Sequence, residues 1–190
     1  MDWNERYRTG DTPWDKGTHA PALEEIDRAW DFSSIPGKIL VPGCGAGHDA
    51  RWLTQQGARV LALDIAPLAI EMARENLAGL PAEVREGDFF KPEPESVDAI
   101  FEHTCFCAIE PERRRDYARA AASWLAPRGV YFGLFFLNPD GEEGPPYGCT
   151  LAELDELFGQ SFEILAEWQP EAAYPGREGR EWVRILRRTE

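Results

Sequence analysis

The stretch from Lys38 to Asp49, KILVPGCGAGHD, constrains the fold of this chain more than any other feature. It has the pattern of a buried strand that breaks into three glycines, Gly43, Gly45 and Gly47, and then starts a helix. Glycine allows a positive φ and the close approach of a ligand, and a helix start offers unpaired backbone N–H groups. The stretch therefore predicts a cradle for a nucleotide-type ligand, with an ordinary tight turn as the alternative.

Strand and helix patterns alternate along the rest of the chain. Strands are expected at 38–42, 59–64, 82–86, 97–101 and 130–137, and helices at 21–30, 47–56, 67–78, 111–125 and 150–158. This order predicts an α/β fold with a doubly wound, mostly parallel sheet. Two further strands, 162–168 and 181–186, have no helix between them and predict an antiparallel C-terminal hairpin at the sheet edge.

Charge, hydropathy and cysteine content restrict the kinds of partner and the cellular compartment that we expect for this chain. The 190 residues carry 20 basic and 34 acidic side chains, and a formal net charge of −14 disfavours nucleic acid and anionic membrane surfaces. No apolar run approaches the roughly 20 residues of a membrane span, and the polar start is unlike a signal peptide. Four cysteines are too few for a disulfide framework. We expect one cytoplasmic domain over residues 1–190 that acts on a small molecule; the oligomeric state is open, and a monomer is compatible with these features.

Polar residues follow the ends of the predicted parallel strands, where ligands bind in such sheets. Asp64 comes 21 residues after Gly43, the separation at which an acid after the second strand can accept hydrogen bonds from ribose hydroxyls. Its alternative role is to cap the helix that starts at Pro67. Asp88 is either a turn residue or an acceptor for an adenine amino group, with Phe89 stacked on the ring. Together these acids predict an adenosine ligand.

Residues at the helix start distinguish between two adenosine cofactors. A nicotinamide dinucleotide prefers Gly-x-Gly-x-x-Gly, whereas this chain has His48 at the last position and Asp49 after it, which would repel a diphosphate. S-adenosylmethionine carries a cationic sulfonium and no phosphate, and it suits an acidic surface with aromatic faces. The residues therefore favour S-adenosylmethionine, with a nicotinamide-dependent reductase as the weaker alternative.

The N-terminal arm, residues 1–19, holds Trp3, Tyr7 and Trp14 among glycines and prolines and has no helical or strand period. Aromatic residues in an irregular arm either pin it to the body of the protein or fold over a ligand as a lid. Composition alone favours pinning.

Five motifs occur in order along nearly the whole chain. They are Trp3…Tyr7…GDTPWDxG at 10–17, VPGCGAGHD at 41–49, GDFF at 87–90, FCAIEP at 106–111 and GPPY at 144–147. In combination they resemble the thiopurine S-methyltransferase superfamily, and within it the plant-type halide, thiocyanate and thiol methyltransferases. The chain departs from the plant pattern at Tyr7, where those proteins tend to have a second tryptophan, and at His103, where they tend to have tyrosine.

The resemblance implies a class I methyltransferase with a Rossmann-like fold and an N-terminal aromatic lid that closes over S-adenosylmethionine. It turns the arm's aromatic residues from pinning residues into expected cofactor contacts. The cofactor-binding residues it implies are Trp3, Tyr7 and Trp14 in the lid, Gly43, Cys44 and Gly45 at the methionyl part, Asp64 at the ribose, Asp88 and Phe89 at the adenine end, and also Ile65 and His103.

Methyl transfer from a sulfonium is an in-line displacement, so the protein has mainly to align donor and acceptor and exclude water. The expected acceptor is a small soft nucleophile, namely a thiol or hydrosulfide, thiocyanate or a halide. We predict that His103 acts as a base or acceptor guide and that Thr104 and Tyr147 shape the pocket. Purely structural roles are the alternative for His103 and Tyr147, and a catalytically silent S-adenosylmethionine-binding module is the alternative function.

Overall fold

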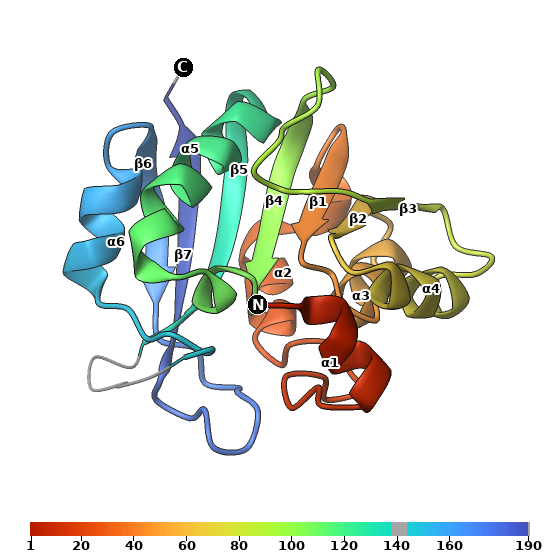
Figure 1. The fold of residues 1–190 in the computed structure, drawn as a ribbon. Helices are drawn as coiled ribbons and strands as arrows, with labels where there is room; N and C mark the ends of the chain where they lie inside the picture. The colour runs from red at the N-terminus through yellow and green to blue at the C-terminus, as the bar shows by residue number, and fades with distance from the viewer. Residues whose placement is uncertain (138–143, 190) are drawn as a thin grey trace.

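A computed structural model describes residues 1–137 and 144–189 of the chain. In this part seven strands form one sheet in the order β3-β2-β1-β4-β5-β7-β6 (Figure 1). Their bounds are β1 Lys38–Pro42, β2 Arg59–Asp64, β3 Ala82–Glu86, β4 Val97–His103, β5 Leu125–Phe136, β6 Phe162–Trp168 and β7 Glu181–Arg188. Neighbours among β1–β5 pair in parallel, and β7 pairs antiparallel with both β5 and β6. The predicted doubly wound sheet with an antiparallel C-terminal hairpin is confirmed.

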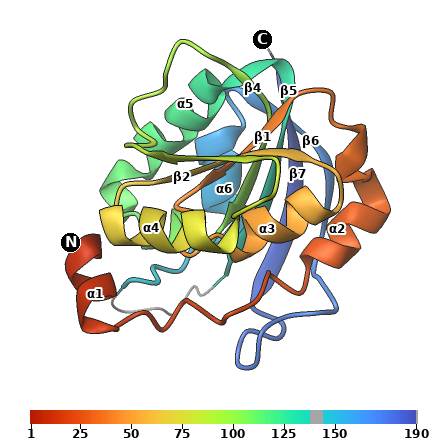
Figure 2. The ribbon, with the colours of Figure 1, turned by 90° about the vertical axis from the view of Figure 1, so that its right-hand side faces the viewer.

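Helices cover both faces of the sheet (Figure 2). They are α1 Trp3–Thr9, α2 Leu23–Trp30, α3 His48–Gln55, α4 Pro67–Asn76, α5 Arg114–Trp124 and α6 Leu151–Phe158. Side chains of α2, α3 and α4 form one hydrophobic core with the sheet, and those of α5 and α6 form the other. None of these helices is long and apolar enough to cross a membrane.

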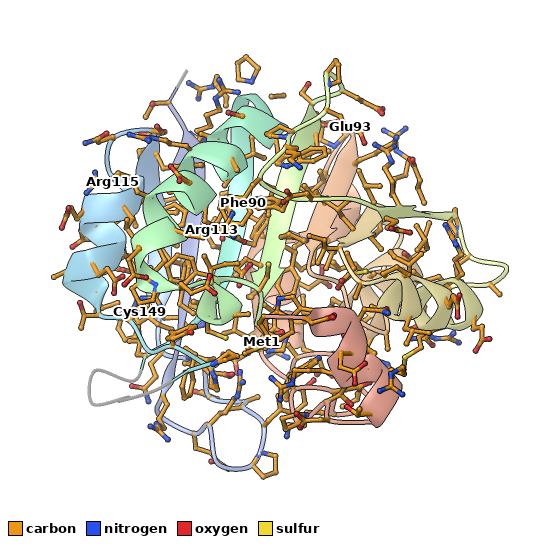
Figure 3. The ribbon with its side chains drawn as sticks, in the orientation of Figure 1. Met1, Phe90, Glu93, Arg113, Arg115 and Cys149 are labelled. Atoms are coloured by element: carbon orange, nitrogen blue, oxygen red, sulfur yellow. The ribbon has the colours of Figure 1, made fainter. Side chains whose placement is uncertain are left out.

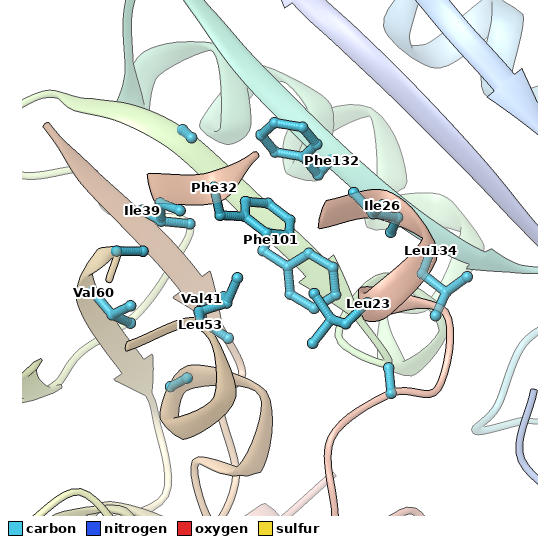
Figure 4. Packing of buried hydrophobic residues seen from close by; sticks show 14 of the residues in the cluster. Leu23, Ile26, Phe32, Ile39, Val41, Leu53, Val60, Phe101, Phe132 and Leu134 are labelled. Atoms are coloured by element: carbon cyan, nitrogen blue, oxygen red, sulfur yellow. The ribbon is translucent and has the colours of Figure 1, made fainter. Parts of the chain in front are cut away.

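Strand β5 is apolar on both faces because it lies inside the sheet, between β4 and β7. Phe132 and Leu134 pack toward α2, and the Phe132 ring centre lies 5.0 Å from that of Phe32, in the 3₁₀ turn Phe32–Ser34 that follows α2 (Figure 4). Tyr131 and Phe135 face the opposite core. This two-sided packing makes the centre of the sheet a rigid support for the carboxyl ends of the parallel strands.

The N-terminal arm departs from the sequence expectation, which was an irregular segment. Residues 3–9 form α1, whose N-cap Asp2 accepts a hydrogen bond from the Glu5 N–H at 3.0 Å and whose C-cap Gly10 has a φ of 72°. The helix is only 7 residues long and none of them is fully buried, so its two apolar side chains, Trp3 and Tyr7, are too few for a search for helical periodicity to find. The two caps were the available signals.

Strand β4 is longer than predicted, since Glu102 and His103 pair with β5 instead of following the strand. Successive side chains of a strand point to opposite faces. Glu102 therefore contacts Tyr117 of α5, whereas His103 contacts Asp49 of α3. This register decides the surroundings of both side chains in the site.

Candidate active site

A cavity of about 390 Å³ lies beyond the carboxyl ends of the parallel strands. Figure 1 shows α1 and the loop between β6 and β7 at this same end of the sheet. A smaller recess of about 50 Å³ adjoins the cavity, and Tyr7, Trp14, Lys16, Gly43 and Thr104 line both. The predicted site residues that line the main cavity are Trp3, Tyr7, Trp14, Gly43, Asp64, Ile65, Asp88, Phe89, Thr104 and Tyr147; Cys44, Gly45 and His103 line the recess. The fold thus brings all of the predicted residues together.

The glycine turn has the geometry of a close-fitting cradle. Gly43 and Gly45 have φ values of 57° and 54°, a region that side chains other than glycine rarely adopt. A Cβ on Gly43 would lie 2.9 Å from the Cys105 Sγ, and one on Gly45 would lie 2.9 Å from the Tyr7 hydroxyl. Glycine is therefore required at both positions, both for the backbone and for the space above it.

Asp64 connects the glycine turn to the end of β2. Its Oδ2 accepts a hydrogen bond from the Gly45 N–H, and its Oδ1 accepts one from the Ala66 N–H, each at 2.9 Å. Burial raises the pKa of this carboxyl group, and the backbone donors partly oppose the rise. Each oxygen keeps acceptor capacity for ribose hydroxyls. Next to it, Ile65 is 55% exposed and gives the cavity an apolar surface.

At the predicted adenine end, the Phe89 ring does not offer a free face on which a base could stack. The Phe89 ring is buried and lies 4.7 Å from the ring of Tyr117, so its faces belong largely to the core. Asp88 accepts a hydrogen bond from the Phe90 N–H at 3.0 Å, which makes it a turn residue as well as a cavity residue. Phe90 lines the cavity, and the central carbon of the Arg113 guanidinium lies 4.0 Å from the centre of the Phe90 ring (Figure 3). The motif Gly-Asp-Phe-Phe contains both residues, and nothing in its pattern distinguishes Phe90 from Phe89.

The aromatic residues of the arm form one cluster over the site. The Trp14 ring lies 5.5 Å from Trp3 and 5.8 Å from Tyr7, and its Nε1–H donates a hydrogen bond to the Tyr7 hydroxyl at 3.2 Å. Because Tyr7 also touches the glycine turn, the arm both packs on the body and lines the cavity.

Asn4 fastens the arm to α4. Its Oδ1 accepts a hydrogen bond from the Leu68 N–H at 3.0 Å, in the first turn of a helix whose own N-cap residue, Ala66, provides no side-chain cap. Asn4→Ala is expected to destabilise the fold by about 1 kcal/mol, the usual value of a lost cap, and to weaken S-adenosylhomocysteine binding several-fold. Calorimetric titration and urea unfolding measure the two effects. Asn4→Asp keeps the acceptor and serves as the control; unchanged affinity in Asn4→Ala would show that the cap does not hold the lid.

His103 is held by a buried carboxylate in the recess. Its Nδ1 lies 2.8 Å from the Asp49 Oδ2, and the Asp49 Oδ1 accepts a hydrogen bond from the Ala20 N–H at 2.7 Å. Burial raises the pKa of Asp49, but the charge and hydrogen bond of His103 outweigh it, so the net shift is downward. An ionised Asp49 fixes the proton on Nδ1. The Nε2 is buried and has no hydrogen-bond partner in the described residues.

Asp49 is therefore not the free acid at the helix start on which the preference for S-adenosylmethionine over a nicotinamide dinucleotide rested. Its carboxylate is occupied by Ala20 and His103, and it repels a diphosphate less directly than a free acid at the helix start.

Thr104 and Tyr147 contribute different parts of the cavity wall. Thr104 has a φ of 64°, a strained conformation for a β-branched residue, and its hydroxyl donates to the His103 carbonyl at 2.7 Å. The Tyr147 N–H donates to the Cys107 carbonyl at 2.7 Å, and its own carbonyl accepts from Arg114. The cysteine thiols are free, and burial raises their pKa values, which keeps them as neutral S–H groups.

Comparison with known proteins shows what the chain is similar to. The family model described as thiopurine S-methyltransferase (TPMT) matches residues 1–185. Thiocyanate methyltransferase 1 from Brassica oleracea is 36% identical over 163 residues, covering 82% of this chain and 70% of that protein. A probable thiol methyltransferase 2 from Arabidopsis thaliana is 33% identical over 186 residues, covering 94% of this chain and 81% of that protein.

The fold is that of class I methyltransferases. The crystal structure of 1,6-didemethyltoxoflavin-N1-methyltransferase from Burkholderia thailandensis, with bound 1,6-didemethyltoxoflavin and S-adenosylhomocysteine, superposes with a TM-score of 0.75. The match has 21% sequence identity and covers 100% of this chain and 86% of that one. At this identity the likeness is one of fold.

Proposed function

We propose, from the premise that this chain belongs to the thiopurine S-methyltransferase family of S-adenosylmethionine-dependent methyltransferases, that its acceptor is a small soft nucleophile. Thiols, hydrosulfide, thiocyanate and halides form this class. The carrying observation is one part of the cavity wall that is small and apolar, formed by Cys107, Ala108, Ile109, Pro145 and Pro146. Basic side chains, Arg6, Lys16, Arg113 and Arg177, line other parts of the same cavity. The same cavity of about 390 Å³ must also hold the cofactor, which favours a small acceptor.

The residues present fit the cofactor. The two glycines at which a Cβ would collide suit the methionyl part, Asp64 has acceptor capacity for ribose hydroxyls, and Ile65 offers an apolar surface for the base. When bound, S-adenosylmethionine supplies a methyl group on an electrophilic sulfonium. The chain's own contribution is to hold donor and acceptor in line under the aromatic arm and to exclude water.

For His103 the surroundings support a cofactor role better than that of an acceptor base. Its ring lies in the recess with Gly45 and Asp49, whereas the proposed acceptor wall belongs to the main cavity. With Nδ1 bound to Asp49, Nε2 is available to the polar methionyl end, as an acceptor when neutral and a donor when protonated. Thr104 and Tyr147 shape the wall on this proposal.

His103→Phe is therefore expected to raise the KM for S-adenosylmethionine about tenfold, the value of one hydrogen bond to a charged group. At saturating cofactor, the turnover of a protonated thiol and of iodide is expected to fall equally. Steady-state kinetics with both acceptors measure this, and His103→Gln, which keeps a polar end, is expected to lie between the two proteins. A loss confined to the thiol would instead make His103 the acceptor base.

The acceptor class is tested directly with purified protein. S-adenosylmethionine is incubated with hydrosulfide, methanethiol, thiocyanate, iodide and a thiopurine, and S-adenosylhomocysteine and methylated products are measured. Turnover of one or more of the small acceptors above that of the thiopurine is expected. Preference for the thiopurine would overturn the small-acceptor proposal, and binding of S-adenosylhomocysteine without any turnover would support a silent binding module.

Two further features of the protein stay proposals. We propose that it acts in the cytosol, which its four free thiols support, and that residues 1–190 act as one domain. The nicotinamide-dependent reductase is set aside, because the family is S-adenosylmethionine-dependent.

A further inference from the structure

A buried acid lies on the opposite face of β4 from His103. Glu102 is 1% exposed; its Oε2 accepts a hydrogen bond from the Tyr117 hydroxyl at 2.5 Å, and its Oε1 accepts one from the Phe106 N–H at 2.7 Å. Burial raises the pKa of this carboxyl group to about 7, although both hydrogen bonds oppose the rise. The functional roles assigned above make no use of this group, which exchanges a proton near neutral pH.

Two side chains connect Glu102 with the cavity. Tyr117 of α5 and Cys105 both line the cavity wall, and the Cys105 thiol interacts with the Tyr117 side chain. A Cβ on Gly43 would lie 2.9 Å from the Cys105 Sγ, so this thiol lies directly against the glycine turn. Burial raises the pKa of Cys105 well above its ordinary value, which keeps it a neutral S–H. The order from cavity to core is therefore thiol, phenol and carboxylate.

We propose that Cys105, Tyr117 and Glu102 form a proton path that carries the proton of a thiol or hydrosulfide acceptor from the cavity to the buried Glu102 carboxylate. The proposal rests on the proposed function, since only a protonated acceptor has a proton to lose. Thiocyanate and iodide carry none and do not need the path.

In the proposed reaction a thiol acceptor gains the methyl group and loses its proton. The acceptor sulfur uses a lone pair to bond the methyl carbon, and the broken C–S bond leaves its electron pair on the cofactor as a neutral thioether. The acceptor proton moves to the Cys105 sulfur as the Cys105 proton moves to the Tyr117 oxygen and the Tyr117 proton moves to the Glu102 Oε2. Glu102 becomes a neutral carboxylic acid and returns its proton to water by the same path after the product leaves.

Because of this path, the rate at which protonated acceptors are methylated depends on the ionisation of Glu102. Above a pH of about 7 the carboxylate is ionised and accepts the proton; below it the group is already protonated. An alkanethiol ionises above the value of about 8.5 for a cysteine-like thiol, so an inflection near pH 7 does not come from the acceptor itself.

The test compares Glu102→Gln and Tyr117→Phe with wild type, using methanethiol and thiocyanate between about pH 6 and pH 9. Glutamine keeps an oxygen for the Phe106 N–H. Each variant is expected to lower the ratio of the methanethiol rate to the thiocyanate rate about tenfold or more and to remove the inflection near pH 7. Tyr131→Phe is the matched control, because it removes a buried hydroxyl of the same core that also interacts with Tyr117 but does not line the cavity; its ratio is expected to stay at the wild-type value.

Two further measurements test the path, and the second of them does not depend on turnover. Cys105→Ala is expected to lower the rate ratio, whereas Cys105→Ser, which keeps a protic group, restores it in part. In the unloaded protein, an infrared carboxylic acid band is expected to titrate near pH 7 and to be absent from Glu102→Gln.

Several results would overturn the path. Equal losses for the two acceptors in Glu102→Gln and Tyr117→Phe would make these residues structural, and an inflection that persists in Glu102→Gln would assign it to another group. A wild-type protein without the titrating infrared band refutes the path but leaves the proposed function intact. A wild-type protein that methylates neither acceptor, nor any other of the small acceptors, refutes the proposed function and the path with it.

Discussion

Asp64→Ala is expected to weaken S-adenosylmethionine binding by about 100-fold. The carboxylate holds the N–H groups of Gly45 and Ala66, each at 2.9 Å, and is 7% exposed. Alanine leaves both donors without a partner and loosens the glycine turn, in addition to removing the proposed ribose acceptor. One hydrogen bond to a charged group contributes about 1.5–3 kcal/mol, so the loss of the ribose contacts alone accounts for this factor.

Calorimetric titration with S-adenosylhomocysteine measures the affinity, and urea unfolding measures the stability of the same variant. Asp64→Asn retains one carbonyl oxygen and is expected to bind between wild type and Asp64→Ala. A folded Asp64→Ala protein that loses less than about tenfold in affinity would show that Asp64 only organises the turn.

Arg114→Met is expected to cost about 3 kcal/mol of unfolding free energy, which lowers the melting temperature by about 6–12 °C. Arg114 is 1% exposed, yet its guanidinium donates to Glu153 at 2.8 Å, to the Gly148 carbonyl at 3.0 Å and to the Tyr147 carbonyl at 2.9 Å. The side chain thus joins α5, α6 and the wall that carries Tyr147. Methionine fills much of the volume but satisfies none of these acceptors.

Arg115→Met is the matched control, because the neighbouring Arg115 makes an exposed ion pair with Glu156 on the same two helices. Such a pair contributes about 0–1 kcal/mol, so little change in melting temperature is expected. Differential scanning calorimetry compares the two. Similar losses in both variants would refute the structural role of the buried arginine. The kcat/KM for the acceptor is expected to fall in Arg114→Met alone, since only this change frees the Tyr147 wall.

The parallel part of the fold was predictable because its signals are local. Each of β1, β2, β3 and β4 is a short apolar or mixed run that ends at a glycine or polar residue, and the cavity forms where those ends meet. The antiparallel pairing of β6 with β7 followed from the missing helix between residues 168 and 181, whereas the place of β7 between β5 and β6 did not. What periodicity missed was α1, a helix of 7 residues with only two apolar side chains, Trp3 and Tyr7.

The pairings inside the site were not predictable from spacing. His103 and Asp49 are 54 residues apart, and Arg114 and Tyr147 are 33 residues apart. No local pattern assigns a buried arginine to a loop carbonyl. The choice between Phe89 and Phe90 likewise depends on which ring meets Tyr117 in the core, because both residues are aromatic and follow the same strand.

The position of β7 inside the sheet has a consequence for synthesis of the chain. The residues proposed to bind the cofactor lie at or before His103 in the sequence, whereas β5 gains its second neighbour only when residues 181–188 emerge from the ribosome. Until then β5 presents an apolar edge that is open to mispairing with other chains. The nascent protein is thus expected to need protection late in translation, after the cradle for its cofactor has already been made.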